Sequence, residues 1–156
     1  MSFFGLDLAQ KGLSLYTIPA AFVMAMLPNV YAVSGAGAHY DLCNPRKLQT
    51  SVVADDKIDK IAKARILRAK AASENAFETL GFYSAAVVAA NFAGVDAETV
   101  NILTLGYVGS RALYNIIYVR LQDNRSFGPV RSLAWLASIA ITVTLYAKAA
   151  TQLASS

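Results

Sequence analysis

The sequence predicts an all-α integral membrane protein, with residues 1–156 forming a single four-helix antiparallel bundle. Two observations support this fold class. The chain is 56% hydrophobic and only 15% charged, whereas about 25% of residues are charged in soluble domains. Eleven of the 24 charged residues lie between Arg46 and Lys70, so much of the rest of the chain consists of long apolar runs.

The first transmembrane helix is expected over residues 12–33, which carry no charge. At 1.5 Å per residue this run is long enough to cross the ~30 Å hydrocarbon layer. An acidic residue, Asp7, precedes it, whereas a cleaved signal peptide has a basic lead and a shorter apolar core. Pro19 and Pro28 should kink this helix, and the glycines at 35–37 should end it.

The second helix is expected over residues 57–92, and its first turns belong to the polar segment of residues 39–64 that follows the first helix. Asp55 or Asp56 is suited to cap its N-terminus, because a carboxylate accepts hydrogen bonds from the first free backbone N–H groups. The helix should enter the membrane near Arg68.

The third and fourth helices are expected over residues 99–121 and 129–151. Asp96 or Glu98 starts the third helix after a very short turn, and Pro129 suits the first turn of the fourth. Short connections of this kind place consecutive helices antiparallel.

Basic residues are concentrated on one side of this arrangement. The loops after the first and third helices carry Arg46, Lys47, Lys57, Lys60, Lys63, Arg65, Arg120 and Arg125, whereas the opposite side has Lys11 with Asp7, Asp96 and Glu98. Because basic loops remain cytosolic, both termini are expected away from the cytosol, in the lumen of the endoplasmic reticulum if the host is eukaryotic.

Composition also argues against two other classes of site. The net charge of +4 does not indicate nucleic-acid binding, because the lysines at 57–63 alternate with aspartates and no aromatic stacking surface accompanies them. Cys43 is the single cysteine and His39 the single histidine. An internal disulfide is therefore excluded, and no ligand set for a metal such as zinc is available.

A polar stripe marks the second helix, where Arg68, Asn75 and Glu78 fall within a quarter-turn of one another. Charged groups at bilayer depth cost ~2.5–3.5 kcal/mol each, so they persist where they face a partner, water or a ligand. The stripe is thus a candidate binding site. The alternatives are an interhelical salt bridge without a ligand and a helix end that is still in water.

The third helix carries a second polar row, with Tyr107, Arg111, Tyr114 and Tyr118 on one face. Phenols donate hydrogen bonds and arginine keeps its charge, so the row suits an anionic ligand or a thiolate. For Tyr107 alone, a place in the interfacial aromatic belt is the competing interpretation. Stripes of this kind would be shared between neighbouring copies, which predicts a homotrimer.

Arg131 and Ser132 lie in the first turn of the fourth helix. The positive end of a helix dipole favours anions there. Alternatively, Arg131 reaches out to lipid headgroups.

Three segments resemble signatures of the MAPEG family, the membrane-associated proteins in eicosanoid and glutathione metabolism. RAKAASENAFE resembles the second-helix signature, SRALYNIIY the third and GPVRSLAW the opening of the fourth. The matches occur in the family's order and cover roughly residues 57–150.

This resemblance implies a trimer that binds glutathione between subunits near the cytosolic face. The implied glutathione ligands are Arg68, Asn75, Glu78, Arg111, Tyr114 and Tyr118. Arg131, with Ser132, would correspond to the residues that activate the thiol. The implied activity is attack of the glutathione thiolate on a lipophilic electrophile or hydroperoxide from the bilayer, by conjugation, reduction or isomerisation.

The chain departs from the family pattern in three places. Ala71 stands where the family often has a further arginine, and residues 34–38 lack the basic residues that close the first helix in eicosanoid synthases. The connection between the third and fourth helices, residues 122–128, is longer than in the family pattern, so Arg125 competes with Arg131 for the catalytic role. A non-enzymatic membrane scaffold or binding protein, with the polar stripes joining helices, is the alternative function.

Overall fold

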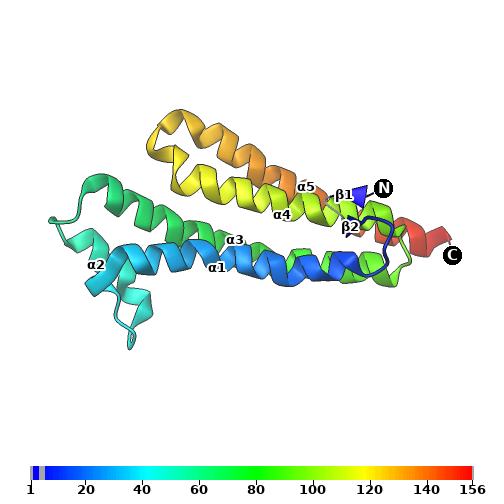
Figure 1. Ribbon diagram of the computed structural model, residues 1–156, viewed down its shortest axis with the longest axis horizontal. Coiled ribbons are helices and arrows are strands. Elements are labelled where there is room, and N and C mark those ends of the chain that lie inside the picture. Colours follow the sequence, from blue (N-terminus) through cyan, green and yellow to red (C-terminus); the bar gives the residue numbers. More distant parts are fainter. Residues whose placement is uncertain (1, 4–5, 156) are drawn as a thin grey trace.

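Four long helices form the bundle in the computed structural model, which describes residues 2–3 and 6–155. They are α1 (Thr17–Ala36), α3 (Lys60–Phe92), α4 (Ala97–Val119) and α5 (Gly128–Ser155). Figure 1 shows two antiparallel pairs, in which α1 packs along α3 and α4 along α5. Helix α3 also contacts both α4 and α5. Both chain ends lie at the end of the bundle that carries the α3–α4 turn (Figure 1).

Short elements precede α1 and connect the long helices. These are β1 (Ser2–Phe3), β2 (Leu6–Asp7), η1 (Leu13–Tyr16), η2 (Gly37–His39), η3 (Pro45–Lys47), α2 (Leu48–Ala54), η4 (Leu121–Asp123) and η5 (Arg125–Phe127), where η marks a 3-10 helix. The strands form one antiparallel pair of two residues each. Neither this pair nor α2 was expected from the sequence, because both segments are shorter than a periodic pattern needs to be visible.

The N-terminus of α3 corrects one expectation. Asp59, rather than Asp55 or Asp56, is the capping residue, and its carboxylate accepts hydrogen bonds from the backbone N–H groups of the next turn at 3.0 Å. Asp55 Oδ2 instead lies 3.0 Å from Nε2 of His39. The expectation for α4 is confirmed, because Asp96 caps that helix.

The prolines of α1 differ in their effect. Pro19 lies in the first turn of α1 rather than in its interior, so it removes no backbone hydrogen bond from the helix. Pro28 lies inside the helix and leaves the carbonyl of Met24 without its helical donor. Nδ2 of Asn115 on α4 donates to that carbonyl at 2.8 Å, so a neighbouring helix satisfies the freed group.

The remaining boundaries are displaced by a few residues from those expected. Helix α1 ends at Ala36, where Gly37 takes the left-handed φ of 52° that glycine tolerates. Helix α4 begins two residues earlier than expected, and α5 continues to Ser155 instead of about residue 151. Terminal turns depend on tertiary contacts, which makes them the least predictable part of a helix.

Small residues allow α1 and α3 to pack closely. Their buried alanines are Ala21, Ala25, Ala32 and Ala36 on α1 and Ala69, Ala72, Ala76, Ala86 and Ala90 on α3. A Cβ atom added at Gly35 would lie 3.1 Å from Cγ1 of Ile66, tighter than most real contacts. Small residues at helix contacts are typical of membrane bundles, in which close backbone approach provides the packing energy.

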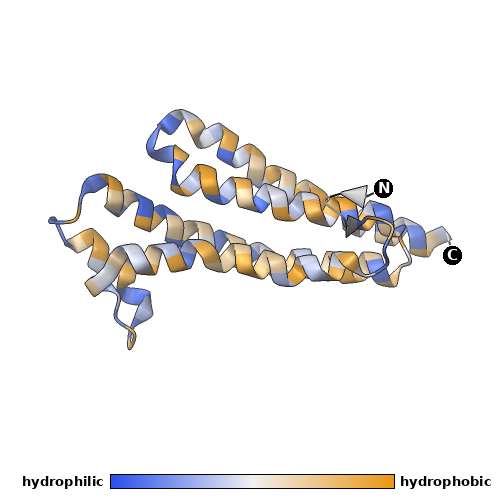
Figure 2. Cartoon of the chain, viewed as in Figure 1, coloured by the Kyte–Doolittle hydropathy of each residue, from blue (hydrophilic) through white to orange (hydrophobic). Residues whose placement is uncertain are grey.

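Two segments, Leu13–His39 and Arg125–Ser155, are long and apolar enough to cross a membrane. Within the described residues, the other two expected spans, α3 and α4, are not apolar enough to be identified in the same way. Helix α3 has 33 residues and α4 has 23, which correspond to about 50 and 35 Å, so both are long enough. Their polar residues lower the mean hydropathy, and Figure 2 shows hydrophilic positions on both helices as well as on the loops opposite the termini.

Candidate functional site

Arg111 is a buried cation on α4, with only 2% of its surface exposed. Its nitrogens Nη1 and Nη2 each lie 3.3 Å from Oδ1 of Asn75 on α3, and its Cζ atom lies 4.5 Å from the centre of the Tyr114 ring. No carboxylate among residues 2–3 and 6–155 forms an ion pair with it. Because a buried charge without a counter-ion is costly, this guanidinium favours an anionic ligand.

A cavity of about 420 Å³ lies beside this pair and is lined by Asn75, Tyr114, Arg131, Ser132, Trp135 and Leu136. Arg131 is half-buried, and its Cζ atom lies 4.8 Å from the centre of the Tyr118 ring. Its Nη2 atom donates to Oγ of Ser132 at 3.4 Å, and that hydroxyl donates to the carbonyl of Gly128 at 3.2 Å. The start of α5 thus brings a cation and a hydroxyl to a cavity that Asn75 also lines.

The cavity has an apolar side as well as a polar one. Trp135 and Leu136 follow Arg131 by about one helical turn and contribute side chains to its wall. The indole Nε1 of Trp135 is buried and has no acceptor among the described residues. Charged and apolar walls together suit a polar ligand whose reaction partner is lipophilic.

Arg68 lies in a separate cluster. Its Nη2 atom donates to the carbonyl of Val119 at 3.3 Å and to Oδ1 of Asp123. Arg65 holds the other carboxylate oxygen, with Nε at 2.8 Å from Oδ2. The hydrogen bond from Arg65 is the main reason why the pKa of Asp123 is lowered, and Arg68 contributes in the same direction. The two arginines therefore join the start of α3 to the α4–α5 connection.

The other residues predicted for the site lie outside the cavity. Glu78 is exposed on α3, one turn beyond Asn75, and Arg125 is exposed in η5. Tyr107 is part of the protein core, where its ring stacks on Tyr83 with 3.5 Å between centroids. The structure thus brings Asn75, Arg111, Tyr114, Tyr118, Arg131 and Ser132 together and leaves Arg68, Glu78 and Arg125 around them.

Sequence reasoning missed Asp123 and Trp135 in this region, and Tyr83 in the core beside Tyr107. Asp123 could have been predicted as a partner for basic residues, because it is the only acidic residue in the polar connection at residues 122–128. Trp135 was visible too, since it lies four residues after Arg131 and hence on the same helical face. Tyr83 had no such signal, because a single tyrosine in an apolar run does not reveal its stacking partner.

Comparison with known protein families shows to which family this chain belongs. The model of the MAPEG family matches residues 13–151, which include all four long helices except the last four residues of α5. The chain belongs to the MAPEG family. Searches among curated proteins and among solved structures found no match.

MAPEG membership and the two apolar segments together indicate an integral membrane protein. Membership also indicates a glutathione-related function of the transferase or peroxidase type, although some MAPEG proteins are not enzymes. The segments that resembled MAPEG signatures are those that contribute Asn75, Arg111, Tyr114 and Arg131 to the site.

Proposed function

We propose that this protein is a glutathione-dependent membrane enzyme that acts on lipophilic electrophiles or hydroperoxides. The observation that carries the proposal is the buried Arg111, which has an amide partner in Asn75 and no carboxylate partner among the described residues. A guanidinium in that position fits the carboxylate of a peptide ligand, which it can bind through two parallel hydrogen bonds.

Binding is divided between two groups of residues in this proposal. Arg111 and Asn75 hold a carboxylate and an amide of glutathione, while Arg68 and Glu78 hold its charged ends from outside the cavity. Tyr114 and Tyr118 provide ring surfaces beside the two arginines that they contact. Phenol hydroxyls add hydrogen-bond donors at neutral pH.

Arg131 is assigned to the sulfur. Bound glutathione supplies a thiol whose thiolate attacks an electrophilic carbon or reduces a hydroperoxide. Arg131 favours the thiolate by charge, and Ser132 lies within hydrogen-bond distance of the same guanidinium. A thiol with a pKa near 8.5 is only a few per cent ionised at neutral pH. Lowering this pKa by ~2 units requires ~2.7 kcal/mol of preferential thiolate stabilisation, which an arginine at a helix N-terminus in a partly dry site can provide.

The lipophilic partner reaches the cavity from the bilayer along its apolar side, where Trp135 and Leu136 lie. Glu78 is exposed on the single chain although it belongs to the polar stripe of α3. A neighbouring subunit that covers this face would complete the site, so the functional form is a homotrimer. The basic loops face the cytosol, and in a eukaryotic host the membrane is that of the endoplasmic reticulum.

The direct test is calorimetry of glutathione binding to the detergent-solubilised protein. S-methylglutathione is the control, because it keeps the carboxylates and lacks the ionisable thiol. Binding of both compounds, with proton release only for glutathione, is expected. If neither compound binds at millimolar concentration, the enzyme proposal loses its basis.

A non-enzymatic membrane scaffold is the second candidate. Several polar side chains are satisfied by contacts between helices, which favours this alternative. Oγ of Ser73 donates to the carbonyl of Ala25 at 2.8 Å, and Nδ2 of Asn115 donates to that of Met24 at 2.8 Å. Such contacts stabilise a bundle without any ligand. Binding of glutathione without turnover against a panel of electrophiles and hydroperoxides would support the scaffold.

A further inference from the structure

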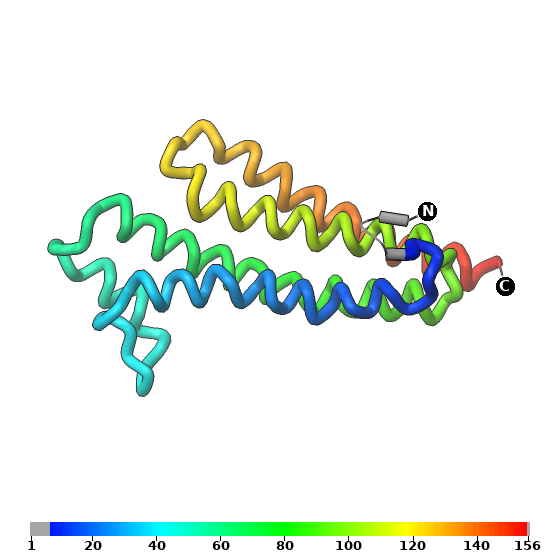
Figure 3. Tube along the Cα trace, viewed as in Figure 1, coloured from blue at the N-terminus to red at the C-terminus, as the bar shows by residue number. Residues whose placement is uncertain are grey.

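A short arm projects from the bundle at the end opposite the chain termini. It consists of residues 40–47, between η2 and α2, and Figures 1 and 3 show it directed sideways from the end of α1. Its turns are internally bonded, because Oδ1 of Asp41 accepts from the N–H of Cys43 at 2.8 Å. The backbone N–H of Asn44 donates to the carbonyl of Asp41 at 3.1 Å, and that of Lys47 to Asn44 at 3.1 Å. The arm is therefore a folded feature of defined shape.

The surface of this arm combines an apolar side chain with two cations. Leu42 is 83% exposed, among the most exposed large hydrophobic residues of the described chain. Arg46 and Lys47 are exposed too. In the described parts of the chain, neither of these two cations forms an ion pair. An exposed leucine beside unpaired cations is the pattern of a segment that binds at a membrane interface.

Other basic residues at this end of the bundle differ, because nearby acceptors engage or balance them. Nζ of Lys63 donates to the carbonyl of Val53 at 3.0 Å. Lys57 and Lys60 alternate with three aspartates in DDKIDK, whereas the arm has two basic residues and only Asp41. The arm thus carries a local positive surplus, and an acidic surface is its electrostatic complement.

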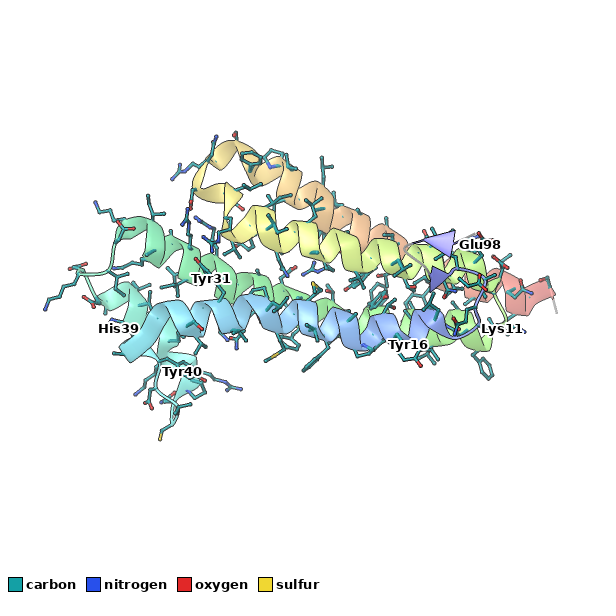
Figure 4. The ribbon with its side chains drawn as sticks, viewed as in Figure 1. Lys11, Tyr16, Tyr31, His39, Tyr40 and Glu98 are labelled. Carbon is teal, nitrogen blue, oxygen red and sulfur yellow. The ribbon has the colours of Figure 1, made fainter. Side chains whose placement is uncertain are left out.

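The position of the arm relative to the bilayer supports the same partner. The apolar segment that includes α1 ends at His39, so the arm begins where the chain leaves the hydrocarbon layer. Figure 4 shows His39 and Tyr40 at the base of the arm, at the end of the bundle far from Lys11. Because the bundle axis crosses the membrane, a segment directed sideways from that axis lies along the membrane surface.

We propose that residues 40–47 bind the anionic headgroup layer of the membrane. Leu42 enters the boundary between headgroups and acyl chains, while Arg46 and Lys47 contact lipid phosphates and carboxylates. The proposal requires no glutathione and holds whether or not the protein is an enzyme.

The native Cys43 provides the measurement, since it is exposed, lies next to Leu42 and is the only cysteine of the chain. An environment-sensitive fluorophore on this thiol is read in nanodiscs of phosphatidylcholine alone and in nanodiscs that also contain phosphatidylserine. We expect a blue-shifted emission and protection from an aqueous quencher in the anionic discs. Changing both cations, with Arg46→Gln and Lys47→Gln, should lower the ratio of membrane-bound to water-exposed arm roughly 25-fold, about five-fold for each charge.

The matched control is the double variant Lys57→Gln and Lys60→Gln. It removes two exposed cations at the same end of the bundle, outside the arm. This control should keep the lipid-dependent shift. An equal loss in both double variants would overturn the proposal in favour of a diffuse basic surface. Equal protection of the probe in neutral discs, anionic discs and detergent would overturn it too, because a neighbouring subunit would then cover the arm.

A label-free experiment removes any influence of the fluorophore. Trypsin cleaves after Arg46 and Lys47, so cleavage of the unlabelled protein reports access to the arm. We expect several-fold slower cleavage there in anionic than in neutral nanodiscs, and Leu42→Ser should reduce that difference. Equal cleavage rates in the two kinds of disc would contradict the proposal, provided that trypsin itself has the same activity on a soluble substrate in both.

Discussion

Both terminal nitrogens of Arg111 lie 3.3 Å from the amide oxygen of Asn75, which makes Asn75 the hydrogen-bond partner of a buried cation. The contact joins α3 to α4 beside the cavity. It also leaves the positive charge without a neutralising group among the described residues. A site for an anion and a structural contact between helices therefore coincide at one residue pair.

Asn75→Ala should reduce both stability and affinity for glutathione. The unpaired guanidinium is expected to cost about 1–3 kcal/mol, the penalty of a buried polar group that loses its partner. Thermal unfolding in detergent measures the first effect and calorimetry the second. Gln152→Ala, a change of an exposed amide on α5, is the control and should leave both unchanged. Wild-type stability in the Asn75 variant would show that the contact is not formed.

Asp123 should make stability depend on pH in a defined direction. Its pKa is lowered in the folded protein, mainly by the hydrogen bond from Arg65. A lowered pKa contributes stability above the unfolded aspartate value of about 3.9, and this contribution is lost as the pH falls through the folded pKa. Asp123→Asn should therefore lower the unfolding temperature at neutral pH, and the difference from wild type should shrink on acidification through this window. The control Asp56→Asn, a change of an exposed aspartate, should leave the unfolding temperature at neutral pH unchanged.

Cys43 reports the orientation in the membrane. The basic loops are expected to face the cytosol, and Cys43 is exposed in the first of them. A membrane-impermeant thiol reagent applied to sealed vesicles with the cytosolic side outward should label it without permeabilisation, at high ionic strength, where salt screens the binding of residues 40–47 to anionic headgroups. Labelling only after the vesicles are opened would reverse the assigned topology.

The assembly is expected to be a homotrimer, because the exposed Glu78 and the polar stripe around it need a neighbouring subunit. Mass measurement in mild detergent tests this expectation. A monomer that persists over a wide range of concentrations would count against shared sites.

Helical periodicity predicted which residues share a face, and it predicted correctly the contacts between residues of the same helix. Arg111 and Tyr114 are three residues apart, and their contact follows from that spacing. Arg68 and Asn75 also share a face, but seven residues separate them by about 10 Å along the axis. The structure accordingly places Arg68 with Asp123 rather than with Asn75.

Contacts between helices could not be predicted in the same way, because they depend on helix rotation and on how loops fold. Asp55 was a plausible cap by position, yet His39 of a distant segment engages its carboxylate. The hydrogen bond between Arg111 and Asn75 likewise depends on the relative register of α3 and α4, which the sequence does not give. The resemblance to MAPEG signatures helped to predict which residues of different helices meet, because it identified residues on three helices at once. It did not predict Asp123.

Thiolate formation in two arginine variants tests the central claim most directly. Arg131 lines the cavity and Arg125 is exposed outside it. Arg131→Ala should keep measurable glutathione binding, lose most of the thiolate ultraviolet absorbance at neutral pH and lower turnover by roughly one to three orders of magnitude, the effect of removing one electrostatic stabiliser. Arg125→Ala should change none of these strongly. Loss of thiolate in the Arg125 variant alone would make that residue the activator, and unchanged thiolate in both variants would contradict the proposed mechanism.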